Sequence, residues 1–188
     1  EQGPADTTRL PALAPERARP VAGDWLVTPV DRRAGVHRGE RTDELVMTNG
    51  LVRRVWRLAP NAACVAFDAL TTGESLLRAV EPEARVVIDG VALDVGGLTG
   101  QVDRAFLLPA WLDDLEADPA ALAFTGFAVG PTVERMAWRR KRWSEERPWP
   151  PPGAGLRLDF AAPSGGAHAG LAVSVHYEMY DGLPVVQK

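Results

Sequence analysis

Apolar and polar residues alternate along the C-terminal part of the chain. Between residues 171 and 179 every odd position is apolar, and the polar positions between them include Ser174, His176 and Glu178. Side chains alternate between the two faces of a β-strand, so this spacing predicts one strand with a packed face. The polar face is expected to meet water or another domain.

Short apolar runs separated by turn dipeptides follow one another along most of the chain. Asn49-Gly50 and Asp89-Gly90 stand between apolar flanks, which predicts hairpins closed by type I′ turns. A third hairpin is predicted at Asp181-Gly182. Further strands are predicted at residues 54–58, 63–70, 122–129 and 156–160, and the one short helix at about 109–116. The pattern predicts an all-β, antiparallel β-sandwich.

The two ends of the chain differ in composition from its centre. Residues 1–22 are rich in proline and poor in large apolar residues, which predicts a disordered N-terminal arm before a β-sandwich domain at residues 23–188. The start at Glu1 without methionine is typical of a mature secreted protein. The short return strand after Gly182 leaves its partner's edge poorly covered, so the domain is expected to be truncated and to continue past Lys188.

Charge and cysteine content narrow the range of partners. Twenty-one basic and 25 acidic residues give a net charge of −4, which favours neither nucleic acid nor an anionic membrane. No apolar run approaches the roughly 18 residues that span a bilayer. Cys64 is the single cysteine, so no intramolecular disulfide forms, and its neighbours Val65 and Phe67 indicate a buried thiol.

No motif supplies a catalytic or metal centre. His37, His168 and His176 lack the spacing of metal ligands, and His176 with Glu178 is interpreted as an ordinary surface pair. Three acidic residues near the predicted helix are interpreted as surface charge rather than a calcium site: Asp113, Asp114 and Asp118. The glycines from Gly96 to Gly100 are interpreted as a turn, since no lysine or helix accompanies them. We expect no catalytic residue, metal or cofactor.

Three tryptophans are interleaved with five basic residues between residues 136 and 153. The candidate residues for contact with carbohydrate or with a neighbouring domain are Trp138, Arg140, Arg142, Trp143 and Trp149. Indole rings stack on sugars, and arginines reach hydroxyl or carboxylate groups. Stacking on single-stranded nucleic acid uses the same parts, but nearby glutamates oppose it. The alternative is that these tryptophans pack in the core of the sandwich or in an interface between domains.

Four groups of residues resemble a known family. They are residues 45–58, with Asn49-Gly50-Leu51, residues 68–77, with Thr72-Gly73-Glu74, and the later residues 85–100 and 176–184. The chain resembles the β-supersandwich, galactose-mutarotase-like domains that precede the catalytic barrel of glycoside hydrolases of the α-galactosidase (melibiase) type. The resemblance implies a supersandwich, and in that family the catalytic aspartates lie on the barrel. None of them can be transferred to this chain.

Three functions are compatible with these observations. The first is a secreted, non-catalytic N-terminal domain that packs on the catalytic domain of the same polypeptide, C-terminal to Lys188, in a hydrolase acting on plant or microbial poly- or oligosaccharide. The alternative is a free-standing carbohydrate-binding module that uses Trp138, Trp143 and Trp149. A small complete enzyme acting on sugars is the third.

Overall fold

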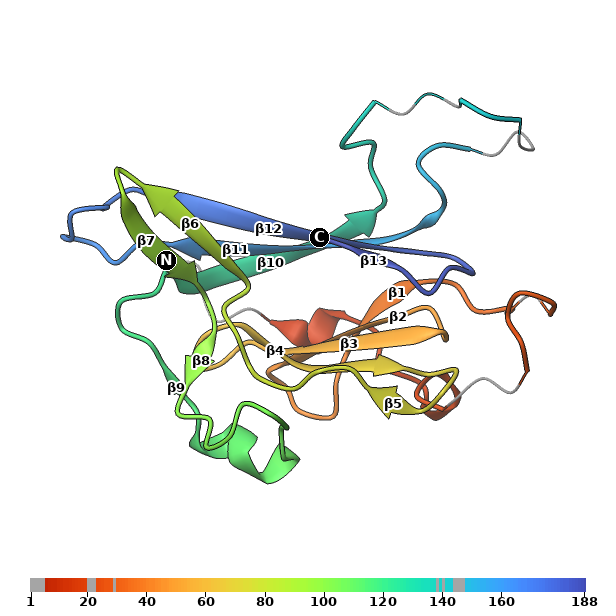
Figure 1. Cartoon of the computed structure of the whole chain (residues 1–188), viewed down its shortest axis with the longest axis horizontal. Coiled ribbons are helices and arrows are strands. Elements are labelled where there is room, and N and C mark those ends of the chain that lie inside the picture. Colours follow the sequence, from red (N-terminus) through yellow and green to blue (C-terminus); the bar gives the residue numbers. More distant parts are fainter. Residues whose placement is uncertain (1–5, 20–22, 29, 138, 140, 144–147) are drawn as a thin grey trace.

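The computed structural model describes residues 6–19, 23–28, 30–137, 139, 141–143 and 148–188. Two antiparallel sheets face each other across the molecule (Figure 1). The first sheet consists of β1 (Gly35–Arg38), β2 (Glu44–Thr48), β3 (Val52–Arg57), β4 (Ala63–Ala69) and β5 (Glu74–Ser75). The second consists of β10 (Ala123–Pro131), β11 (Gly153–Ala161), β12 (Ala172–Tyr180) and β13 (Val186–Gln187). The predicted all-β, antiparallel sandwich is confirmed.

Smaller elements lie beside the two sheets. Two short ladders pair β6 (Ala84–Ile88) with β7 (Val91–Val95) and β8 (Leu98–Thr99) with β9 (Glu116–Ala117). The described residues form three short 3₁₀ helices, η1 (Thr7–Arg9), η2 (Pro15–Arg17) and η3 (Pro109–Asp114), of which η3 lies where the sequence predicts a helix. Within the described residues, no helix is long and apolar enough to cross a membrane.

The predicted hairpins exist, but their turns differ. Asp89 and Gly90 have φ of 52° and 80°, and Ile88 pairs with Val91, as a type I′ turn requires. At the first hairpin Gly50 has φ of 83°, whereas Asn49 does not have a positive φ, so the type I′ prediction is wrong there. The cause is the buried Asn49 side chain, which accepts hydrogen bonds from the backbone of the next residues and widens the turn.

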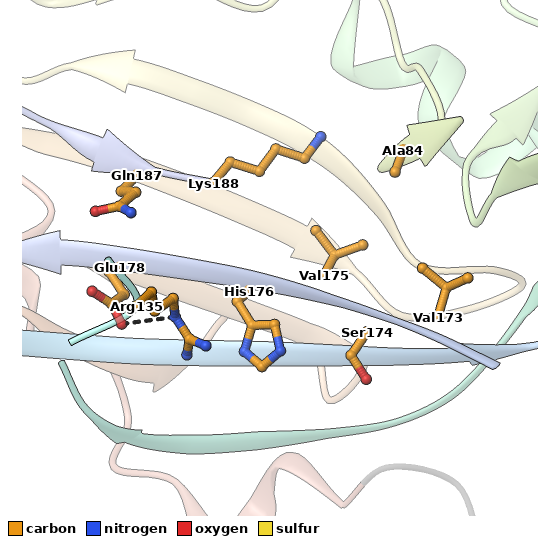
Figure 2. A pocket seen from close by; sticks show the side chains of 9 residues that line it. All are labelled: Ala84, Arg135, Val173, Ser174, Val175, His176, Glu178, Gln187 and Lys188. Carbon is orange, nitrogen blue, oxygen red and sulfur yellow. Dashed lines mark hydrogen bonds and ion pairs between the residues drawn. The ribbon is translucent and has the colours of Figure 1, made fainter. Parts of the chain in front are cut away.

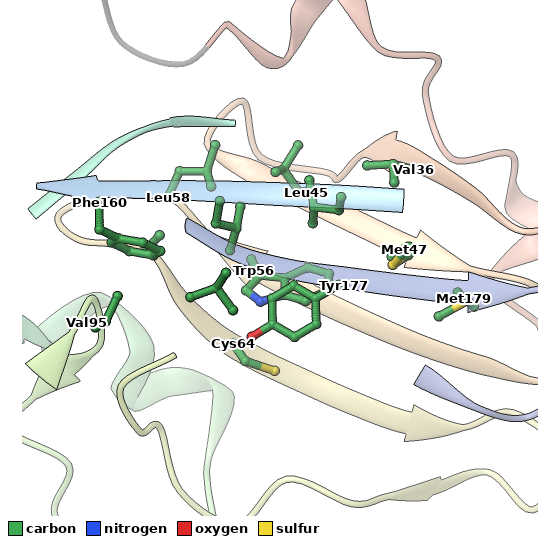
Figure 3. Close-up of a cluster of buried hydrophobic side chains, with 14 of the residues drawn as sticks. Val36, Leu45, Met47, Trp56, Leu58, Cys64, Val95, Phe160, Tyr177 and Met179 are labelled. Carbon is green, nitrogen blue, oxygen red and sulfur yellow. The ribbon is translucent and has the colours of Figure 1, made fainter. Parts of the chain in front are cut away.

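The core lies between the inner faces of the two sheets (Figure 3). The indole of Trp56 from β3 packs on the ring of Tyr177 from β12, with 4.8 Å between ring centroids. Phe160 from β11 is 1% exposed, and its ring meets Phe124 from β10 edge-on. Large apolar side chains from both sheets therefore share one core, which fixes how the sheets face each other.

Part of the N-terminal segment runs along the first sheet. The backbone N–H of Arg38 donates to Pro11 O at 3.0 Å, and Leu13 N donates to Arg38 O at 3.3 Å. Thr7 is buried, and its hydroxyl donates to Thr42 O. The arm at residues 1–22 is predicted from amino-acid composition alone. Composition does not indicate whether a segment forms backbone hydrogen bonds with a strand.

Candidate functional site

A long connection between β10 and β11 carries the residues that the sequence analysis singles out. We call residues 132–152 the β10–β11 loop, and its described parts rise away from the sheets in Figure 1. Trp143 is 92% exposed, Trp149 is 40% exposed, and Arg142 is exposed as well. Trp138 and Arg140 lie outside the described residues. Trp143 is therefore not packed in the core of the sandwich. For this residue, the alternative that the tryptophans fill the sandwich is wrong.

Hydrogen bonds join the two ends of the β10–β11 loop to each other and attach its start to the second sheet. The hydroxyl of Thr132 donates to Pro151 O at 2.8 Å and joins the two ends of the loop. Val133 N and Arg135 Nε each donate to Glu178 Oε1 at 3.1 Å. The start of the β10–β11 loop is thus held over the end of β12.

This attachment corrects the expectation for the polar face of β12. Glu178 is 2% exposed, so it is not part of a surface pair with His176. The start of the β10–β11 loop covers it, and the hydroxyl of Tyr180 donates to its other carboxylate oxygen at 3.2 Å. Gly155 on β11 stands opposite Glu178, and a Cβ at Gly155 would lie 3.0 Å from the backbone oxygen of Pro131, where the β10–β11 loop begins. Periodicity alone cannot show that a loop returns over a strand.

A second buried carboxylate lies inside the sandwich. Glu83, which directly precedes β6, is 1% exposed. Its Oε1 accepts from the backbone N–H of Cys64 at 2.7 Å, and its Oε2 accepts from Trp56 Nε1 at 3.1 Å and from the hydroxyl of Tyr177. Arg54 Nη2 lies 3.8 Å from Oε2. We call these five residues the Glu83 cluster.

Charge and aromatic rings stabilise the Glu83 cluster together. The guanidinium of Arg54 lies 4.8 Å from the centroid of the Tyr177 ring and 5.2 Å from that of Trp56, within cation–π range. Burial, and then the charge of Glu83, raises the pKa of Tyr177, so the phenol stays protonated and donates to Glu83. Both oxygens of Glu83 are occupied by protein donors, so the cluster joins the two sheets rather than presenting a free acid to a substrate.

Cys64 belongs to this cluster and is expected to be chemically inert. Burial raises the pKa of its thiol from 9.0 to about 11, so the thiolate that reacts with electrophiles is scarce at pH 8. We expect alkylation by iodoacetamide at pH 8 to be at least about 100-fold slower in the folded protein than in guanidinium chloride. Mass spectrometry of the single cysteine measures both rates. Equal rates would show that the thiol is accessible and is not buried in the core.

No metal centre is found within the described part of the chain, where no three His, Cys, Asp or Glu side chains gather to hold an ion. Asp113, which the sequence analysis weighs as a calcium ligand, accepts a hydrogen bond from Arg57 Nη1 at 2.7 Å. This ion pair fixes η3 against β3.

Glu83 is not among the candidate residues that the sequence indicates. A buried indole N–H and phenol require an acceptor, which is a signal that some acidic or carbonyl group must lie nearby. The sequence does not indicate which of 25 acidic residues fills that role. Only the packing of β3, β4 and β12 around the segment before β6 identifies it.

Together, the two sheets and the exposed β10–β11 loop define a β-sandwich that presents aromatic and basic side chains on a long connection. Comparisons with protein families, with curated proteins and with solved structures gave no match to this chain.

Proposed function

We propose that the chain is a non-catalytic accessory domain of a larger extracellular glycoside hydrolase, and that it packs on the catalytic domain of that polypeptide. The β10–β11 loop supplies the contact. The catalytic domain acts on plant or microbial poly- or oligosaccharide, and the accessory domain covers part of it.

The observation that carries this proposal is the exposure of apolar side chains on the β10–β11 loop. Trp143 is 92% exposed, Met136 is 59% exposed and Val133 is 44% exposed. Burying one such indole against a partner is worth about 3 kcal/mol. Trp, Met and Arg are enriched at protein interfaces, and Arg142 stands directly before Trp143. The loop therefore has the composition of a contact surface.

The glycoside hydrolase assignment rests on the family resemblance. Asn49-Gly50 lies between β2 and β3, and Thr72-Gly73 lies between β4 and β5, so both motifs occupy connections of the first sheet. Gly50 and Gly73 have φ of 83° and 74°, which explains the glycine in each motif. In the resembling domains the same turns occur ahead of a catalytic barrel.

The state of the buried carboxylates supports a non-catalytic role. Glu83 and Glu178 are the two carboxylates that are almost fully buried among the described residues, and each accepts several protein hydrogen bonds. A general acid for glycoside hydrolysis must reach the glycosidic oxygen. Both groups are instead occupied by donors of their own fold.

The alternative function is a free-standing carbohydrate-binding module. The observation that favours it is that Trp143 and Trp149 stand exposed on one loop with Lys141 and Arg142, the parts of a stacking platform. This function requires no catalytic domain in the same polypeptide.

The first experiment reads the coding sequence beyond the codon for Lys188. A β/α-patterned region of several hundred residues supports the accessory role, and a stop codon there rules it out. If the β/α-patterned region is present, two variants of the parent polypeptide are purified, Trp143→Ala and Val102→Ala. Val102→Ala is the control, because it truncates a 77% exposed side chain outside the β10–β11 loop.

We expect Trp143→Ala to weaken the docking of the domain on the catalytic domain of the parent. Loss of the indole reduces the free energy of docking by up to about 3 kcal/mol. In thermal unfolding of the parent, we expect either a lower Tm or two separate transitions. The isolated chain should keep its Tm with either substitution, since both sites are exposed. Turnover of glycosides by the isolated chain, or glycan binding by it that Trp143→Ala abolishes, contradicts the accessory role.

A further inference from the structure

Strand β12 has an edge that is only partly paired. Ala172–Tyr180 pairs with β11 along its whole length, whereas the ladder with β13 joins only Glu178 to Gln187 and Met179 to Val186. In Figure 1 β13 accompanies one end of β12, and the rest of β12 extends past it. Unpaired strand edges are templates for further strands.

The direction of the backbone groups along β12 shows which of them face this open edge. Leu171 O accepts from Ala162 N, and Asp181 N donates to Pro152 O, so these odd positions face β11. Tyr180 O accepts from Leu183 N on the opposite side. Backbone groups alternate along an antiparallel strand, so the N–H and C=O groups of Ala172, Ser174 and His176 face away from β11. Within the described residues, these three positions have no ladder partner on that side.

A hollow of about 360 Å³ lies along this edge. Side chains from both faces of β12 line it: Val173 and Val175 on the inner face, Ser174 and His176 on the outer face (Figure 2). Ala84 from β6 closes the far side, and Gln187 and Lys188 close one end. A hollow that both faces of one strand line is at the edge of that strand, where a further strand would lie.

The line of β13 leads directly into the hollow. Val186 packs against the core, whereas the side chain of Gln187 contacts the hydroxyl of Tyr180, so the two side chains show the alternation of a strand. Lys188 comes next, and its Nζ lies 5.8 Å from the centroid of the Tyr177 ring. If the register that pairs Gln187 with Glu178 continues, it places Lys188 opposite Tyr177 and a further strand segment opposite His176 to Ala172.

We propose that an extended segment of the parent polypeptide, in line with β13, adds antiparallel to β12 along Ala172, Ser174 and His176. This rests on the proposed function, because it requires the larger polypeptide. The segment carries apolar side chains opposite Val175 and Val173, where the hollow meets the core, and polar side chains beside Ser174 and His176. The addition extends the β12–β13 ladder and connects the sandwich rigidly to the catalytic domain.

Amide hydrogen exchange, resolved by residue, tests this pairing in the isolated chain and in the parent. We expect the amides of Ala172, Ser174 and His176 to exchange at least about 100-fold more slowly in the parent. The amides of Val173 and Val175 face β11 and should be protected in both proteins. Equally fast exchange of the three edge amides in both proteins overturns the proposal.

A substitution pair gives a second measurement. Ser174→Pro removes the N–H that faces the open edge, and Ser174→Ala keeps it, while both lose the hydrogen bond from the Ser174 hydroxyl to Asp159. In the parent, we expect Ser174→Pro to restore fast exchange at Ala172 and His176, and Ser174→Ala to leave it slow. Slow exchange at both positions in folded Ser174→Pro overturns the proposal. If Ser174→Pro does not fold, the wild-type comparison decides.

The outcomes separate this inference from the proposed function. Fast edge exchange in a parent whose docking depends on Trp143 overturns the strand pairing alone. A polypeptide without a catalytic domain overturns the proposed function and this inference with it. Concentration-dependent protection of the same amides in a dimer of the isolated chain, seen by light scattering, assigns the edge to a second copy and overturns the proposal.

Discussion

Replacing Glu83 with alanine is expected to lower the free energy of unfolding by about 3–5 kcal/mol. The substitution leaves the guanidinium of Arg54, which is 17% exposed, without its counter-charge. It also removes the acceptor of Cys64 N–H, Trp56 Nε1 and the Tyr177 hydroxyl, all of which lie in the interior. Urea denaturation monitored by tryptophan fluorescence measures the change.

Glu81→Ala is the matched control for this prediction. Glu81 stands two positions before Glu83, but its side chain is 59% exposed and pairs with Arg104, which is 58% exposed. We expect its loss to change the free energy of unfolding by less than about 0.5 kcal/mol. If Glu83→Ala is as mild as Glu81→Ala, then the Glu83 carboxylate does not join the two sheets. A double substitution with Arg54→Leu should recover part of the loss, since no buried charge then remains unpaired.

Replacing Asn49 with alanine is expected to lower the free energy of unfolding by about 2–4 kcal/mol. Its fully buried amide nitrogen donates to Tyr180 O at 2.7 Å and to Leu183 O at 2.6 Å. Its oxygen accepts from Leu51 N at 3.0 Å and Val52 N at 3.2 Å. The substitution leaves these backbone groups without that partner, and it releases the β12–β13 connection from the first sheet.

Two measurements distinguish this effect from a general loss of stability. Amide exchange in the β12–β13 connection should accelerate in Asn49→Ala under conditions where the amides of β11 remain protected. Thr72→Ala, at the exposed turn that leads to β5, should change the free energy of unfolding by less than about 0.5 kcal/mol. Similar losses for the two substitutions would mean that Asn49 acts only within its own turn.

The candidate site was predictable in composition but not in geometry. Local sequence shows that Trp143 and Arg142 stand close together on one connection, because they are neighbours along the chain. It does not show that Trp143 is exposed, since exposure depends on where the connection leaves the second sheet. The hydrogen bonds from Val133 and Arg135 to Glu178 join residues that are more than 40 positions apart. No local pattern contains that information.

Local sequence is sufficient to define most strands of this protein and its fold class. Period-two alternation and glycine turns indicate strands and hairpins because both depend on residues a few positions apart. Which polar groups are buried depends instead on the packing of the whole chain. The pairing of Glu83 with Tyr177 depends on the distance between two sheets, and the Asn49 turn depends on carbonyl groups that lie more than 130 residues away. Those contacts arise only when the whole sandwich closes, so the interior polar network is a product of tertiary packing.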